Sequence, residues 1–330
     1  MKIVRPLHLV VAVRSVVLLI LSLLAIPVYS QVMPYLKTGD TIAIVASAAK
    51  VTPEQVAPAV QFLQNQGFVV VVPDELFQED NGFAGTVSHR TALLQRFLDR
   101  PGIKAILCAR GGYGTVSLLD SLDFTLFRQH PKWVCGFSDV TALHSHLQVL
   151  GFPTLHSAMP ITIREGNFDS EYNASLLSAL RGEPLHYDFE PNPYNRIGAA
   201  TAPVVGGNLS LLYSLLESVS SISTDGKILF IEDVDENIYH IHRMLVALDR
   251  AGKLKNLKGL VVGSMRNIKF DDYFMDKTVE SVVLEVCGKY GYPVCFDFPA
   301  GHGGRNYALK LGCTATLTVT TEHCSLQFNQ

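Results

Sequence analysis

A short apolar run, a turn and an amphipathic segment follow one another in the stretch Lys132-Trp-Val-Cys-Gly-Phe-Ser-Asp-Val-Thr-Ala-Leu-His-Ser-His-Leu147. The run 133–135 predicts a buried strand, and the residues from Val140 onward predict a helix. Ser138 therefore stands where a strand becomes a helix. In such an elbow the serine hydroxyl projects beyond the C-terminal edge of the sheet, and the backbone N–H groups that follow can stabilise an oxyanion. We expect Ser138 to be a nucleophile; the alternative is that Ser138 or Asp139 only caps the helix.

The elbow matches the G-x-S-x-G pattern in part, because Gly136 precedes the serine but Val140 stands where the second glycine would be. A second glycine-rich turn, Arg110-Gly-Gly-Tyr-Gly114, follows the apolar run 104–108. Its glycines let the main chain approach a ligand and expose N–H groups. We expect these groups to donate to the same oxyanion. A phosphate cradle is a weaker alternative, because the turn has neither G-x-G-x-x-G nor a Walker lysine. The second alternative is a simple tight turn without a role in binding.

Strand and helix patterns alternate along the chain. Strands are expected at 40–46, 68–72, 104–108, 133–135, 227–232, 259–263, 294–297, 315–319 and 325–328. Helices are expected at 53–66, 88–99, 117–122, 209–216, 239–251 and 278–288. This alternation predicts an α/β fold whose parallel sheets hold ligands at the C-terminal ends of their strands.

About 300 residues remain after an N-terminal segment, which is more than one core usually holds. We therefore expect two domains, an N-terminal nucleophile domain at 31–182 and a C-terminal α/β domain with extra β-strands at 204–330. The segment 183–203 is rich in Pro, Asn, Tyr and Glu, shows no clear periodicity, and is predicted to be a linker.

Residues 1–30 have the anatomy of a signal peptide. A basic front made by Lys2, Arg5 and Arg14 is followed by an uncharged apolar run at 15–26, and Val28-Tyr29-Ser30 offers small residues at the positions that a signal peptidase reads. We expect cleavage after residue 30, export to the periplasm, and no stable membrane insertion of the mature chain. The alternative is an uncleaved membrane anchor, although prolines on both sides of residue 30 interrupt the apolar sequence.

The charge and the cysteines limit the classes of function. The formal net charge is -3, and removal of three positive charges with residues 1–30 makes it -6, so nucleic acid is not an expected partner. The six cysteines form no C-x-x-C pair. A disulfide between Cys313 and Cys324, or between Cys287 and Cys295, is permitted in an exported protein, but buried free thiols are the favoured interpretation. The i,i+2 spacing of His144 with His146, and of His240 with His242, places each pair on diverging sides of a helix, so no metal site is expected.

His302 stands out among the histidines because it follows a strand and is flanked by glycines at 301, 303 and 304. Such a loop can bring an imidazole edge to a partner. Glu232 ends an apolar strand pattern and is a candidate carboxylate to orient that imidazole. The alternatives are a structural His302 and a solvated Glu232.

Five ordered motifs resemble the LD-carboxypeptidase family of serine peptidases, which includes the microcin C immunity peptidases. They are Arg110-Gly-Gly-Tyr-Gly114, Gly136-Phe-Ser-Asp-Val-Thr141, Gly206-Gly-Asn-Leu209, Phe230-Ile-Glu-Asp-Val-Asp-Glu236 and Gly301-His302. The resemblance covers the chain from Gly39 to Gly312. It implies a nucleophile domain followed by a domain that bears the acid and the histidine, with the active site between them, and it implies a homodimer.

The resemblance also implies roles for single residues. Ser138 matches the family nucleophile, Glu232 the triad acid and His302 the general base. The expected oxyanion donors are the N–H groups of Asp139 and of Gly111 or Gly112. The residues expected to bind substrate are Arg110, Tyr113 and Asn208.

The implied reaction is the release of a terminal D-alanine from the LD-amide bond of a murein tetrapeptide, through an acyl-enzyme and without a cofactor or metal. Leu216-Glu217-Ser218 departs from the Gly-Thr that is common in the family. This difference can alter the rim of the cleft, so the resemblance indicates the reaction more firmly than the substrate. Two alternatives are hydrolysis of aminoacyl-nucleotide analogues, as in the immunity branch, and a non-catalytic exported solute-binding protein.

Overall fold

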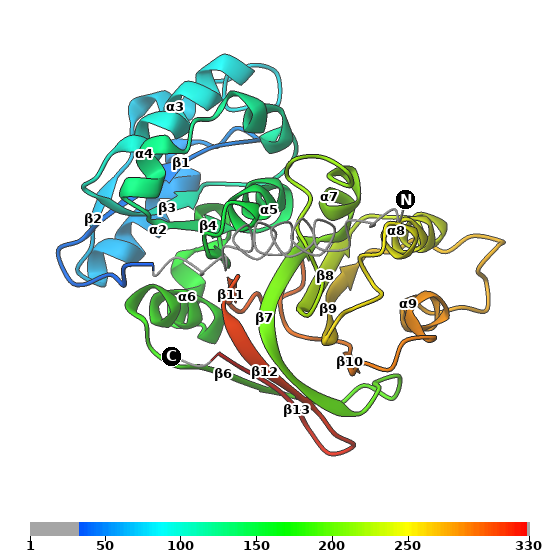
Figure 1. Ribbon diagram of the computed structural model, residues 1–330. Coiled ribbons are helices and arrows are strands. Elements are labelled where there is room, and N and C mark those ends of the chain that lie inside the picture. The colour runs from blue at the N-terminus through cyan, green and yellow to red at the C-terminus, as the bar shows by residue number, and fades with distance from the viewer. Residues whose placement is uncertain (1–32, 329–330) are drawn as a thin grey trace, which may run out of the picture. The chain divides into compact units, whose positions relative to one another are not determined.

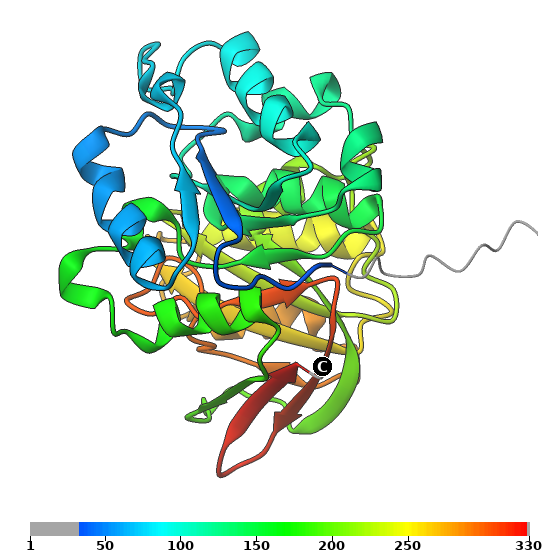
Figure 2. The same cartoon turned by 90° about the vertical axis from the view of Figure 1, so that its left-hand side faces the viewer.

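Two β-sheets organise residues 33–328, which are the residues that the computed structural model describes (Figures 1 and 2). These residues belong to one compact unit. The signal peptide predicted at 1–30 lies outside the described residues. Within residues 33–328, no helix has the length and hydrophobicity that a membrane crossing requires.

The first sheet has the strand order β11-β5-β4-β3-β1-β2. Its strands are β1 (Thr41–Val45), β2 (Val69–Val71), β3 (Ile103–Cys108), β4 (Trp133–Gly136), β5 (Thr154–His156) and β11 (Leu309–Leu311). Strands β1 to β5 are parallel, and β11 pairs antiparallel with β5. Because the carboxyl ends of parallel strands meet at one edge, the loops after β1, β3 and β4 come together there.

Helices and short 3-10 turns connect the strands of the first sheet. They are α2 (Pro53–Asn65), η1 (Asp74–Phe77), α3 (Val87–Asp99), η2 (Thr115–Ser121), α4 (Thr125–Gln129), η3 (Ser138–Val140), α5 (Thr141–Val149), η4 (Pro160–Thr162), η5 (Glu165–Asn167) and α6 (Glu171–Arg181). Helix α2 starts at a capping box between Thr52 and Gln55. Helix α3 ends on the buried ammonium group of Lys132, which donates to the carbonyls of Phe97, Leu98 and Arg100.

The second sheet has the strand order β10-β9-β8-β7-β12-β13-β6. Its strands are β6 (Leu185–Phe189), β7 (Gly198–Asn208), β8 (Ile228–Val234), β9 (Gly259–Arg266), β10 (Val294–Cys295), β12 (Thr314–Val319) and β13 (Cys324–Phe328). The helices of this half are α7 (Leu209–Ser214), α8 (Ile238–Arg250) and α9 (Val279–Cys287). Strand β7 takes part in both parallel and antiparallel pairing. Its residues 204–208 run parallel to β8, and its residues 198–203 run antiparallel to β12 (Figure 1).

The α/β class, with a parallel N-terminal sheet and a C-terminal half that carries extra strands, is confirmed. One element-level prediction is wrong: residues 183–203 are not irregular, because they contain β6 and the first part of β7. The Gly-Gly-Asn motif at 206–208 forms the end of strand β7. A Cβ atom at Gly206 would lie 1.9 Å from the carbonyl oxygen of Phe230, so only glycine allows this close strand pairing. The domain boundaries at 182 and 204 stay a prediction.

Candidate active site

Ser138 lies in the turn between β4 and α5, where the elbow was expected. Its φ of 63° is in the left-handed region, which is costly for a residue with a side chain and is typical of functional turns. The strand before it is held at the carbonyl of Gly136, which accepts hydrogen bonds from Ser157 N (3.1 Å) and from His144 Nε2 (2.9 Å). Burial lowers the pKa of His144 to about 4, so this imidazole is a neutral donor that supports the turn.

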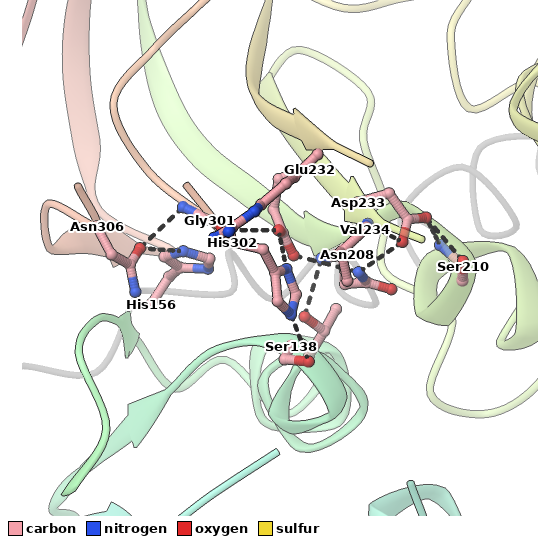
Figure 3. A network of polar contacts seen from close by, with 12 residues as sticks. Ser138, His156, Asn208, Ser210, Glu232, Asp233, Val234, Gly301, His302 and Asn306 are labelled. Atoms are coloured by element: carbon pink, nitrogen blue, oxygen red, sulfur yellow. Dashed lines mark hydrogen bonds and ion pairs between the residues drawn. The ribbon is translucent and has the colours of Figure 1, made fainter. Parts of the chain in front are cut away.

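His302 connects Ser138 with Glu232 (Figure 3). The Ser138 hydroxyl lies 3.0 Å from His302 Nε2, and His302 Nδ1 donates to Glu232 Oε2 at 2.6 Å. The backbone N–H of His302 also donates to Glu232 Oε2, at 3.2 Å. Gly301 allows this approach, because it has a φ of 109° and a Cβ atom there would lie 2.6 Å from Glu232 Oε2. The structure thus brings the three predicted triad residues together.

The electrostatic surroundings of His302 favour its protonated form. Burial alone would lower its pKa, but the hydrogen bond that His302 donates to Glu232 and the negative charges of Glu232, Asp233 and Asp235 outweigh burial and raise the pKa of His302 above its usual value. Glu232 is fully buried and the His302 side chain is 19% exposed, so the charge of Glu232 is poorly screened. An imidazole in this setting can take a proton from a hydroxyl and hold the resulting positive charge.

A buried network fixes Glu232 from behind. Asn208 Nδ2 donates to Glu232 Oε1 (3.2 Å) and to Asp233 Oδ1 (3.0 Å), while Asn208 Oδ1 accepts from Leu211 N at the start of α7. Ser210 donates to Asp233 Oδ2 through both its backbone N–H and its hydroxyl. The amide group of Asn208 is thus used inside the protein. A substrate contact by Asn208 stays a prediction, whereas its support of the carboxylate is observed.

Gly111, one of the predicted oxyanion donors, lies beside the Ser138 hydroxyl. A Cβ atom at Gly111 would lie 2.9 Å from Ser138 Cβ, 3.0 Å from Ser138 Oγ and 3.4 Å from Asp139 N. The absence of a side chain therefore leaves a space beside the hydroxyl, next to the N–H of Asp139 at the start of η3, where helical N–H groups lack intrahelical partners. Gly112 follows with a φ of 112°. This arrangement suits the binding of a developing oxyanion.

The side chain of Asp139 makes a buried contact that the sequence did not indicate. Its carboxylate is buried and accepts a hydrogen bond from Thr115 N at 2.8 Å, just after the glycine-rich turn. Arg90 lies nearby in the buried part of α3 and donates to Ser47 O (2.6 Å) and Gly114 O (3.1 Å). These bonds tie the loops after β1, β3 and β4 to one another. An arginine among the apolar positions of α3 is the only signal in the sequence that could have indicated this.

A second group of residues missed by the sequence reasoning supports the His302 loop. Asn306 Oδ1 accepts hydrogen bonds from Gly301 N (2.9 Å) and from His156 Nε2 (3.0 Å). Burial lowers the pKa of His156 to about 3, so its imidazole is neutral. His156 ends β5 of the first sheet, so Asn306 connects that sheet to the loop that carries His302.

The remaining predicted site residues lie at the surface. Arg110 is exposed and its guanidinium is 3.4 Å from the carbonyl oxygen of Lys50. Tyr113 is 68% exposed and packs against Phe83. Both lie in the loop that bears Gly111, so their expected role in binding substrate stays a prediction.

The structure describes all six cysteines, and each is a free thiol. Neither of the two permitted disulfides is formed, in line with the favoured interpretation of buried thiols. Within residues 33–328, no three His, Cys, Asp or Glu side chains gather in a group that could hold a metal ion.

A serine, a histidine and a carboxylate joined by hydrogen bonds beside backbone N–H donors are typical of hydrolases that use an activated serine. Two family models match the chain: the LD-carboxypeptidase N-terminal domain at residues 42–157 and the LD-carboxypeptidase C-terminal domain at residues 201–317. The chain belongs to the LD-carboxypeptidase family. It is therefore a peptidase of a carboxypeptidase family, which disfavours the solute-binding alternative.

Individual relatives agree with this assignment. A Bacillus subtilis protein named "Probable murein peptide carboxypeptidase" is 34% identical over 86% of this chain and 90% of its own length. The "Murein tetrapeptide carboxypeptidase" of Pseudomonas aeruginosa is 26% identical over 84% and 92%.

Solved structures show the same fold. The crystal structure of muramoyltetrapeptide carboxypeptidase from Oxalobacter formigenes has a TM-score of 0.81 and 25% identity, and covers 88% of this chain and 99% of that chain. The microcin C7 self immunity protein MccF, in a complex with aspartyl sulfamoyl adenosine, has a TM-score of 0.81 at 22% identity, and covers 91% and 99%. The second likeness shows the fold alone.

Proposed function

We propose that this protein is a serine LD-carboxypeptidase that releases the terminal D-alanine from murein tetrapeptides during cell-wall recycling or remodelling. The observation that carries the proposal is the continuous hydrogen-bonded chain from the Ser138 hydroxyl through His302 to the buried Glu232. The names of the relatives support a murein peptide as the substrate.

In the acylation step, His302 Nε2 takes the proton of the Ser138 hydroxyl as Oγ attacks the carbonyl carbon of the LD-amide. Glu232 keeps the imidazole in the tautomer that presents Nε2 to the serine, and its charge stabilises the imidazolium. The N–H groups of Asp139 and of Gly111 or Gly112 bind the oxyanion. His302 then protonates the amine nitrogen, the C–N bond breaks, and D-alanine leaves.

In the deacylation step, His302 removes a proton from water, which attacks the ester carbonyl carbon of the acyl-enzyme. The Ser138–acyl bond breaks, and Ser138 recovers its proton from the imidazolium. The products are a tripeptide with a free carboxylate and the regenerated enzyme. Every proton moves between Ser138, His302, water and the substrate.

We also propose that the mature chain starts near Gln31, acts in the periplasm and forms a homodimer. The signal-peptide pattern of residues 1–30 motivates export, and the family resemblance motivates the dimer. The intact mass of protein recovered from a periplasmic extract tests the cleavage, and light scattering of the purified protein tests the dimer. A mass that includes residues 1–30 or the scattering of a monomer would contradict the respective proposal.

The decisive experiment is mass spectrometry of a murein tetrapeptide before and after incubation with the mature protein. We expect loss of one D-alanine with wild-type protein, and a rate at least about 10³-fold lower for Ser138→Ala, as for other nucleophile removals. Ser214→Ala, which removes an exposed hydroxyl on α7, is the matched control and should retain the wild-type rate. Normal turnover by Ser138→Ala would rule the triad out.

The alternative substrate class is an aminoacyl-nucleotide analogue, and the same assay separates the two. Cleavage of such an analogue with no cleavage of the tetrapeptide would replace the murein substrate but keep the triad. Ligand retained without any product, from either compound, would contradict both.

A further inference from the structure

The positions of the triad and the oxyanion donors determine on which side of the site the leaving group departs. The oxyanion must point at the Gly111 and Asp139 side of Ser138, and the amine nitrogen must point at His302 Nε2, which protonates it. The carboxylate of a departing D-alanine is separated from that nitrogen by a single carbon atom. It therefore lies beside the His302 loop, and a cation next to this loop would recognise it.

Arg266 is a cation that lies against this loop. Its guanidinium Nη1 donates to the carbonyl oxygen of His302 at 3.0 Å. It is the last residue of β9, and its side chain is exposed. Side chains alternate along a strand: Met265 packs into the core beneath the sheet, while Ser264 faces the His302 loop, where its hydroxyl lies 3.1 Å from the Cβ position of Gly303. Arg266 therefore shares the face of Ser264.

The charge of Arg266 is not neutralised by a neighbour. Among the ion pairs formed by residues 33–328, none involves Arg266. One nitrogen is anchored to the His302 loop, which leaves the other N–H groups of the planar guanidinium to bind a carboxylate, for which this group has matching geometry. Arg305, also exposed on this loop, has no hydrogen bond from its side chain within the described residues. Arg110 lies on the opposite, oxyanion side.

We propose that Arg266 binds the C-terminal carboxylate of the peptide substrate, and that this contact restricts the enzyme to the last residue of a chain. The inference rests on the proposed carboxypeptidase function and adds to it the residue that binds the C-terminal carboxylate of the substrate. Arg266 is thereby a specificity-determining residue on the leaving-group side of the site.

The test compares two peptides that differ at one group: a tetrapeptide that ends in L-Lys-D-Ala, and the same peptide with a terminal D-alaninamide. Wild-type protein should prefer the acid by about 10- to 100-fold in kcat/KM, the size expected for a hydrogen bond between charged groups. Arg266→Gln should lose most of that preference, because kcat/KM falls for the acid and stays within about twofold for the amide, the ordinary scatter of a neutral surface change. Arg266→Lys should retain part of it. Arg305→Gln, a matched control on the His302 loop, should keep the wild-type preference.

The outcomes separate this inference from the function on which it rests. If wild-type protein cleaves neither peptide, the proposed function fails. If wild-type protein cleaves the acid but Arg266→Gln lowers both rates equally, Arg266 acts only by supporting the His302 loop and the inference is wrong. A preference that disappears in Arg305→Gln or Arg110→Gln instead would assign the carboxylate to that arginine.

Discussion

At His302, burial and negative charge act on one imidazole in opposite directions. The hydrogen bond to Glu232 and the charges of Asp233 and Asp235 prevail, and the pKa is raised above the usual value of 6.5. A general base must be neutral before it can accept a proton. The raised pKa therefore moves the acid limb of the activity profile to higher pH.

kcat/KM should fall as the pH falls through the pKa of His302, and Asp235→Asn should shift the limb to lower pH because one negative charge near the imidazole is removed. Asparagine tolerates the φ of 60° at this position, and its carbonyl can still accept from Asn267 Nδ2. The measurement is kcat/KM against pH for both proteins.

Glu322→Gln is the control, because it removes the same charge from an exposed site in the turn between β12 and β13. Its profile should coincide with that of the wild type. An acid limb that Asp235→Asn leaves in place, or moves to higher pH, would contradict the proposed electrostatic origin.

At the scale of elements, two turns at neighbouring strand ends form the nucleophile and its oxyanion donors. Gly111→Ala should lower kcat, because the added Cβ would lie 3.0 Å from Ser138 Oγ, in the space beside the hydroxyl where the oxyanion is expected to bind. The expected loss is about 10²- to 10³-fold, as for the loss of one oxyanion donor. Gly102→Ala is the matched control, since no atom lies within 4 Å of its Cβ position. Steady-state kinetics distinguish the two variants. Similar kcat values for both would show that the space beside Ser138 has no part in the reaction.

The buried contact between Asp139 and Thr115 holds these turns in register. Asp139→Ala should lower the free energy of unfolding by about 1 to 3 kcal/mol, because it leaves the Thr115 N–H buried without an acceptor. It should also lower kcat, since the oxyanion donors lose their support. Urea unfolding and steady-state kinetics measure the two effects.

Asp74→Ala, at an exposed position in η1, controls for the loss of a carboxylate and should change neither quantity. A variant at Asp139 that unfolds at the wild-type urea concentration with wild-type kcat would contradict the role of this contact.

Element prediction from the sequence succeeded where the pattern was long and apolar, as in β1, β3, β8 and α8. It failed for β6, although Leu185 and Tyr187 are buried on alternate positions, because five residues between prolines and polar residues give too short a pattern. Residues 198–202 of β7 are mostly small, and β11 has three residues. The pairing of these strands depends on partners that are distant in the sequence and not on their own composition.

At the scale of the whole molecule, Asn306 joins the first sheet to the loop that carries His302. Asn306→Ala should lower the free energy of unfolding by about 1 to 3 kcal/mol, because Gly301 N–H and His156 Nε2–H lose a buried acceptor. It should also lower kcat, since Gly301 positions His302. The control is Asn65→Ala, at the exposed end of α2, which should affect neither. Thermal unfolding and steady-state kinetics test the prediction, and an Asn306→Ala variant with wild-type stability would refute it.

Local patterns were sufficient for the α/β class, the elbow at Ser138, the glycine turn at 110–114 and the glycine loop around His302. These features depend on hydrophobic periodicity and on turn residues, and both are set by residues that are close together in the sequence. The hydrogen bond of 3.0 Å between Ser138 and His302 spans 164 positions. The supporting contacts also join separate elements, with 150 positions between Asn306 and His156, 43 between Arg90 and Ser47, and 24 between Asn208 and Glu232. Such contacts were decided only by the tertiary structure, because a hydrogen bond depends on how whole elements pack, to within tenths of an ångström, and no spacing within the sequence encodes that packing.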